Sequence, residues 1–361
     1  MSSFETFREQ AEAKRLLRSA LEEGSAHAFL LHGPPGVGKR LAAFAVAAQL
    51  LGDPGRVERR AHPDLYVLEP VGEQIRIDDI RALRRDLHMR PFEADRRVYV
   101  VLGAERMNED AADALLKDLE EPPPYAVLVL VADDLGPLPE TIRSRCQLVP
   151  FRRLSERGVR EYLAARAPGL EADVLTALAR VAAGRLDRAE RLLDPAATER
   201  RAILVEVARA VYLEAGFEPG EAAERLLAGA QAHGAAVRAG EERAIEELGL
   251  PAREADQRAR RAGRGAERDE LLAALEELAS WYRDLVVVAS GAESAVIHFD
   301  RLPELREDAT RERMLGAERG CEAVRETWRL LEELNLNPGL ALQALLIRLR
   351  HELAGGVPIS A

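Results

Sequence analysis

The sequence predicts an α/β domain with a parallel sheet, followed by a region that is entirely helical. Three strongly apolar segments, at 28–31, 98–102 and 126–132, are separated by helical patterns, which is typical of strands buried on both faces of a parallel sheet. Beyond residue 151 strand patterns almost disappear, while Ala, Leu, Arg and Glu remain abundant. We therefore expect an α/β domain over 1–152, a small helical lid over 153–197 and a helical C-terminal domain over 198–361.

Helices are expected next to these strands because apolar residues recur at helical spacing. The first helix should run from Gln10 to Glu23, with Gly24 as its stop signal. Further helices are expected over 41–51, directly after a glycine-rich loop, and over 108–121. In the C-terminal region a basic, glycine-bearing stretch at 258–264 is expected to interrupt the helices.

The composition excludes several classes of protein. The 361 residues carry 51 Lys and Arg against 62 Asp and Glu, a formal charge of -11, so nucleic acid should not be wrapped over the whole surface. Two cysteines, Cys146 and Cys321, form no disulfide framework and no zinc-binding pattern. No apolar run approaches the ~20 residues of a membrane span, and no leader pattern opens the chain. We expect a soluble cytoplasmic protein without bound metal or membrane contact.

The loop after the first strand resembles a phosphate-binding loop. Its sequence, HGPPGVGKR, follows a strand and opens a helix, as the Gly-x-x-x-x-Gly-Lys pattern requires. Backbone N–H groups at Gly33, Gly36 and Gly38 are expected to face an anion, and Lys39 to reach outer phosphates. The position that normally carries the magnesium-binding hydroxyl is Arg40. The alternative is a glycine-rich turn that serves only strand-to-helix packing.

Two later motifs, taken together, resemble the bacterial clamp-loader branch of the AAA+ ATPases. They are Ala-Leu-Leu-Lys-Asp-Leu-Glu-Glu-Pro-Pro at 114–123 and Thr-Ile-Arg-Ser-Arg-Cys at 141–146. The resemblance implies that Arg145 is an arginine finger that faces ATP on a neighbouring subunit, where a rigid guanidinium stabilises the transferring phosphoryl group. It also implies that Gly184-Arg-Leu-Asp-Arg-Ala189 is a lid motif with Arg188 at its sensor position, and that the C-terminal helices form an oligomerising collar.

The positions that support hydrolysis in this family are degraded here. An acidic pair should end the second strand, but Leu102 and Gly103 stand there, and Glu105 beyond it is expected to be a solvated carboxylate. A polar sensor should follow the third strand, but Asp133 stands there and would repel a terminal phosphate. Together with Arg40, these losses predict a chain that does not turn over ATP by itself.

The resemblance therefore implies a stator subunit of the DNA polymerase III clamp loader, which completes the ATP site of its neighbour. The implied partners are the motor subunits (tau/gamma), the delta subunit and, through the assembled ring, the sliding clamp and primer-template DNA. ATP is the one cofactor expected, either as a weak ligand of the loop or at the interface with a neighbouring subunit, and no zinc is expected.

Two other functions are compatible with the motifs. One is an active AAA+ ATPase, either a motor subunit of the same loader or a stand-alone enzyme, in which Arg40 is tolerated. The other is a phosphate-loop kinase for a small molecule, which the helical second half and the Ser-Arg-Cys segment at 144–146 disfavour.

Overall fold

The computed structural model describes residues 9–24, 26–70, 74–246, 252–334 and 336–354. The opening residues used above for the absence of a leader lie outside these ranges. The chain divides into an N-terminal unit, residues 1–166 with 183–188, and a C-terminal unit, residues 167–182 with 189–361. The three-part division predicted from the sequence, with boundaries near 152 and 197, stays a prediction.

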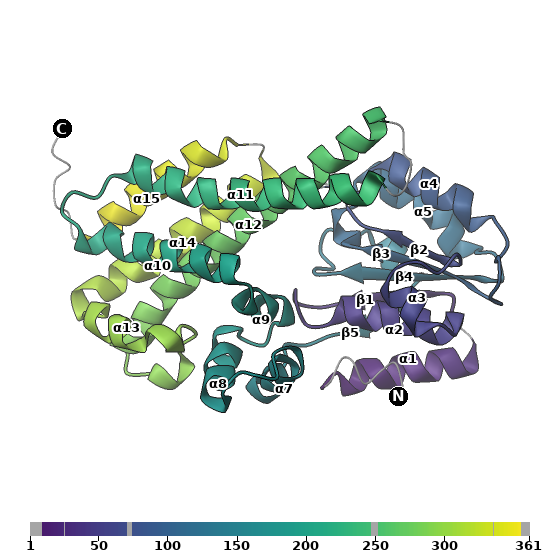
Figure 1. The fold of residues 1–361 in the computed structure, drawn as a ribbon, viewed down its shortest axis with the longest axis horizontal. Coiled ribbons are helices and arrows are strands. Elements are labelled where there is room, and N and C mark those ends of the chain that lie inside the picture. Colours follow the sequence, from purple (N-terminus) through teal and green to yellow (C-terminus); the bar gives the residue numbers. More distant parts are fainter. Residues whose placement is uncertain (1–8, 25, 71–73, 247–251, 335, 355–361) are drawn as a thin grey trace. The chain divides into compact units, whose positions relative to one another are not determined.

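The N-terminal unit contains a five-stranded sheet in which every strand pairing is parallel, in the order β2-β3-β4-β1-β5 (Figure 1). The strands are β1 Ala28–His32, β2 Leu65–Leu68, β3 Arg97–Leu102, β4 Ala126–Ala132 and β5 Gln147–Pro150. The central strands β3 and β4 are buried throughout, as their continuous apolar sequences predict. The predicted fold class, a parallel α/β sheet followed by helices, is confirmed.

Helices cover both faces of this sheet. The buried side chains of α4 and α5 form one core with alternate residues of β1, β3 and β4, including Leu30, Tyr99 and Leu128, while α2 packs on the opposite face (Figure 1). The helical elements of this unit are α1 Ala11–Glu23, α2 Lys39–Leu51, α3 Pro54–Glu58, α4 Ile77–Leu87, η2 Ala104–Arg106, α5 Glu109–Glu120, α6 Glu140–Arg143 and α7 Glu156–Arg166.

The predicted stop at Gly24 is confirmed, and a side-chain cap fixes the start of the helix expected over 108–121. Gly24 ends α1 in the left-handed conformation, and its N–H donates to the carbonyl of Ala20. The Asn108 side chain caps α5 by accepting from the N–H of Ala111 at 3.0 Å. The two edge strands, β2 and β5, were not predicted because each has only four residues and is partly exposed.

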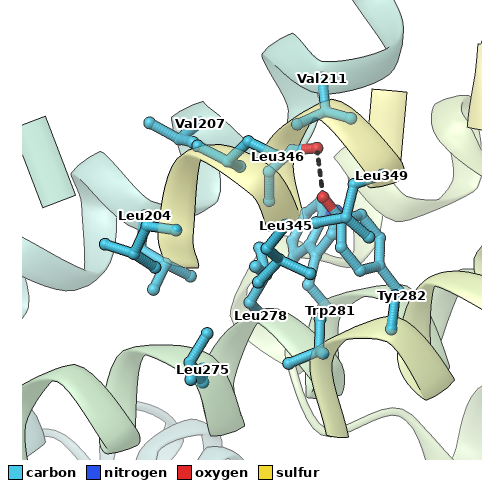
Figure 2. Packing of buried hydrophobic residues seen from close by; sticks show 14 of the residues in the cluster. Leu204, Val207, Val211, Leu275, Leu278, Trp281, Tyr282, Leu345, Leu346 and Leu349 are labelled. Atoms are coloured by element: carbon cyan, nitrogen blue, oxygen red, sulfur yellow. Dashed lines mark hydrogen bonds between the residues drawn. The ribbon is translucent and has the colours of Figure 1, made fainter. Parts of the chain in front are cut away.

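The C-terminal unit is a bundle of helices around one apolar core. Trp281, Tyr282 and Leu346 lie at its centre, fully buried, between α10, α12 and α15 (Figure 2). Asn337 caps α15, with Pro338 as the first helical residue. The elements are α8 Ala172–Val181, α10 Pro195–Leu213, α11 Pro219–Glu246, α12 Ala252–Ala289, η3 Glu293–Ala295, η4 Phe299–Arg301, α13 Leu302–Asp308, α14 Arg311–Glu333 and α15 Pro338–Leu353; α9, Leu186–Leu193, spans the division between the units.

The predicted interruption at 258–264 was wrong, because α12 runs through it without a break. Its glycine serves helix packing instead. A Cβ on Gly263 would lie 3.0 Å from the carbonyl oxygen of Gly234 in α11, and one on Gly234 would lie 2.7 Å from that of Gly263. Two glycines thus allow the backbones of the two long helices to approach closely.

A buried charged cluster also holds this unit together. His298 is fully buried, with its ring nitrogens 2.8 Å from Asp284 Oδ2 and 3.0 Å from Glu277 Oε1. Arg201 joins the cluster by donating to Glu277 at 2.6 Å and to Asp300 at 2.6 Å. Burial opposes protonation of His298, but the hydrogen bonds to Asp284 and Glu277 outweigh it, so the pKa of this histidine is raised.

The helices over the described residues include none with the length and apolarity that crossing a membrane requires.

Candidate phosphate-loop site and arginine finger

The candidate site lies at the carboxyl ends of β1, β3 and β4. In the parallel register His32 pairs with Ala132, and Leu102 pairs with Val131. The residues that follow these strands therefore meet at one edge of the sheet: the glycine loop after β1, Gly103 after β3 and Asp133 after β4. The topology brings together the loop and the two degraded positions identified from the sequence.

Each loop glycine has a local structural reason. Gly33, with φ of 135°, lies so close to the segment after β5 that a Cβ would be 2.2 Å from the carbonyl oxygen of Phe151. Gly36, with φ of 70°, lies against Asp187, and Gly38, with φ of 95°, is the residue at which α2 begins. Packing alone thus accounts for these glycines, and their contact with an anion stays a prediction.

The Lys39 side chain is buried and is bound by neighbouring oxygen atoms. Its side chain is 3% exposed, and its ammonium is 2.7 Å from Asp133 Oδ1. It also donates to the carbonyl oxygens of Gly33 and, at 2.5 Å, of Pro34. Burial lowers the pKa of Lys39, while Asp133 and two further carboxylates, Glu105 and Asp187, oppose that effect. The ammonium is bound by the protein's own oxygen atoms.

Arg40 points away from the loop. Its guanidinium lies 3.0 Å from Glu69 Oε1 and stacks over the ring of Phe44 at 5.8 Å. Its side chain is 56% exposed. Arg40 therefore supplies no hydroxyl for a magnesium ion, and its guanidinium contacts Glu69 and Phe44 instead.

The two positions at the end of β3 where the acidic pair was expected carry no carboxylate. Leu102 is buried, and Gly103 turns the chain with φ of 64°. Glu105 lies just beyond, and the N–H of Asp133 donates to its Oε2 at 3.2 Å. Glu105 is less solvated than expected, because it is half-buried and burial raises the pKa of this group.

The lid motif reaches the loop through a residue that sequence reasoning did not select. The N–H of Leu186 donates to the carbonyl of Gly36 at 2.6 Å, and the carboxylate of Asp187 lies directly over Gly36. Arg185 donates to both oxygens of that carboxylate, at 3.1 and 2.7 Å. The sensor role of Arg188 stays a prediction. The signal for Asp187 was its place beside that arginine in the motif.

Gln10, the residue directly before α1, also contacts the loop. Gln10 is buried, and its amide nitrogen donates to the carbonyl of Val37 at 3.3 Å and of Arg152 at 2.7 Å. In return, the N–H of Arg152 donates to the Gln10 amide oxygen at 3.1 Å. One side chain thus joins the loop to the segment that follows β5.

Arg145 lies at the surface, at the end of α6. Its side chain is 32% exposed, and its Nε donates to Glu120 Oε1 at 2.8 Å. A second nitrogen donates to the carbonyl of Thr141 at 2.8 Å. Cys146, next in the chain, is buried, which raises the pKa of its thiol to about 12 and makes it a packing residue. Arg145 is presented outward from a fixed turn.

Within the described residues, no group of three or more His, Cys, Asp and Glu side chains is arranged to hold a metal ion. The carboxylates near the loop surround the Lys39 ammonium instead.

The parallel sheet, with a glycine loop between β1 and α2, is the arrangement of a phosphate-loop fold. Residues 9–155 match the family model described as DNA polymerase III, delta subunit. The chain is 32% identical to DNA polymerase III subunit delta' of Bacillus subtilis over 187 residues, which are 48% of this chain and 55% of the relative. It is 37% identical to subunit delta' of Pseudomonas aeruginosa over 196 residues, 50% of this chain and 60% of the relative. Over about half of its length the chain is therefore similar to delta' subunits of DNA polymerase III.

The aligned segments span little more than half the length of these relatives. Among solved structures, a gamma subunit-related protein of DNA polymerase III from Thermotoga maritima aligns over 94% of this chain and 99% of its own, at 20% identity and a TM-score of 0.46.

Proposed function

We propose that this chain is a delta'-type stator subunit of the bacterial clamp loader, which takes part in DNA replication by helping to load the sliding clamp onto primed DNA. The relationship to delta' subunits supports the complex. The observation that carries the role is the contrast between Arg145, presented at the surface, and Lys39, buried against its own carboxylate. The chain completes a neighbour's ATP site and does not turn over ATP itself.

The geometry of the loop supports the proposed absence of intrinsic hydrolysis. Phosphoryl transfer requires a metal ion, a group that orients water and a cation on the phosphates. Arg40 points to Glu69, Leu102 and Gly103 offer no carboxylate, and Lys39 is engaged by Asp133. These features disfavour the active-ATPase alternative, for which hydrolysis by the purified chain would be the decisive sign.

The C-terminal helices supply the proposed collar. On α15, Leu340 and Ile347 are 65% and 42% exposed and lie two turns apart, on one side of the helix. Apolar side chains exposed in this way support contact with other subunits. The partners we propose are the tau/gamma motor subunits and delta, with the clamp and primer-template DNA contacted through the assembled complex in the cytoplasm.

The trans role of Arg145 is tested in the assembled complex. Arg145→Ala should lower turnover at the ATP site that it faces by roughly 10³-fold, the contribution of an arginine finger. Arg145→Lys should restore little, because an ammonium does not reproduce the planar fork of a guanidinium. The measurement is steady-state ATPase of the complex, with assembly verified by size-exclusion chromatography.

The matched control is Arg152→Ala, which removes an arginine that is 82% exposed and paired with Glu12. That variant should leave the ATPase of the complex unchanged. Unchanged ATPase in the Arg145→Ala complex would exclude the finger role. Whether the chain is a subunit of the complex is tested separately, by size-exclusion chromatography.

A further inference from the structure

The carboxylate of Asp187 lies directly against the glycine loop that should cradle phosphate. If Gly36 carried a Cβ, that atom would lie 1.7 Å from Asp187 Oδ1 and 2.4 Å from its Cγ. No side chain larger than hydrogen fits between the loop backbone and this carboxylate. Because residues 183–188 belong to the same compact unit as the loop, the contact is internal to that unit.

A neighbouring contact fixes the position of the carboxylate. Leu186, the residue before it and the first of α9, donates its N–H to the carbonyl of Gly36 at 2.6 Å. Arg185, on the other side of Leu186, holds both carboxylate oxygens and is itself largely buried, with 13% of its side chain exposed. Three consecutive lid residues thus place Asp187 on Gly36.

The charge balance of the loop completes the arrangement. The Lys39 ammonium pairs with Asp133 at 2.7 Å, and Asp187 and Glu105 add further negative potential at this lysine. A polyphosphate that entered the loop would therefore meet carboxylates where a functional loop offers an uncompensated cation. The two carboxylates Asp133 and Asp187 remain about half exposed, at 48% and 45%, so solvent reaches them.

We propose that Asp187 is an internal latch, a carboxylate that occupies the phosphate cradle and excludes nucleotide until the first turn of α9 moves away. The loop beneath it is a latent site for a polyphosphate anion, and its occupation does not require magnesium, because the chain has no hydroxyl at Arg40 to hold the metal. The latch goes beyond the trans role of Arg145, since it concerns what this chain's own loop binds.

The latch is tested by titrating the full chain with inorganic pyrophosphate and with ATP, each with and without magnesium, by isothermal calorimetry. Wild type should give no saturable binding at millimolar ligand. Asp187→Asn, which keeps the shape and removes the charge, and Asp187→Ala should bind both ligands, tightening binding by about ten-fold or more, since a carboxylate this close repels each phosphate charge strongly. Asp173→Ala, an exposed lid carboxylate on α8, is the matched control and should behave as wild type.

A second substitution locates the binding. Lys39→Met added to Asp187→Asn should abolish the gained affinity, because the ammonium is the cradle's only lysine side chain among the described loop residues. Circular dichroism verifies that each variant is folded.

Two results would overturn the latch: wild type binding pyrophosphate as tightly as Asp187→Asn, or no gain of binding in either folded Asp187 variant. Neither result bears on the ATPase of the assembled complex, so failure of the latch and failure of the Arg145 role are distinguished.

Discussion

Lys39 and Arg145 are two cations of the same unit, and each is held by a carboxylate, yet they differ in burial. Lys39 is 3% exposed beside Asp133, whereas Arg145 is 32% exposed beside Glu120. Separating a buried cation from its carboxylate costs several kcal/mol, because the surrounding medium has a low dielectric constant. An exposed ion pair contributes only about 0–1 kcal/mol to stability. Burial of the ion pair, more than the presence of the cation, is what separates Lys39 from Arg145, the proposed finger.

His298 extends this comparison to a fully buried cation and carries the largest expected effect. Replacing it by leucine removes the cation that lies between Asp284 and Glu277, although Arg283 and Arg201 still pair with these carboxylates. Loss of one member of a buried pair costs about 3–5 kcal/mol. Denaturant unfolding of His298→Leu should show this loss. His88→Leu, at a side chain 63% exposed, should change stability by less than about 0.5 kcal/mol.

The same histidine predicts a pH dependence. Its pKa is raised in the folded state above the ordinary value of 6.5, so the folded chain binds the proton more tightly. The stability it contributes is fully present below pH 6.5 and is lost as pH rises through the folded pKa. The free energy of unfolding of wild type should therefore fall over that range more steeply than that of His298→Leu; parallel curves would contradict this assignment.

The intermediate effect is expected at the phosphate loop. Asp133→Ala removes the carboxylate paired with the buried Lys39 and should cost about 1–3 kcal/mol, the penalty of an incompletely satisfied buried group. Thermal unfolding measures it. Asp134→Ala, at the adjacent exposed residue, provides the control, and equal effects of the two substitutions would show that burial of Lys39 does not matter.

The smallest effect is expected at the finger. Glu120→Ala removes the exposed partner of Arg145 and should change the free energy of unfolding by less than about 1 kcal/mol. In the assembled complex it should preserve the ATPase that Arg145→Ala lowers, because the phosphate replaces Glu120 as the partner of the guanidinium. A loss as large as that of Arg145→Ala would assign Glu120 an essential positioning role.

The sequence was informative where one physical signal dominated. Continuous apolar runs predicted β3 and β4, and Gly24 predicted the end of α1. In each case the pattern is local, so no distant contact is needed to interpret it.

It failed where distant contacts decide the meaning of a residue. Gly263 was interpreted as a helix interruption, but its reason is Gly234, 29 positions earlier, on another helix. The motif that contains Asp187 did not reveal its contact, because its partner Gly36 is 151 positions away. Lys39 matches a phosphate-binding pattern by type, and only the fold reveals that Asp133 engages it.

The glycine crossing of α11 and α12 has a mechanical consequence. Where two backbones touch without intervening side chains, sliding or rotation of one helix against the other meets hard steric resistance. Two spectroscopic labels on the exposed faces of these helices should consequently report one narrow distance distribution. Gly234→Leu should broaden that distribution, because the larger side chain separates α11 from α12.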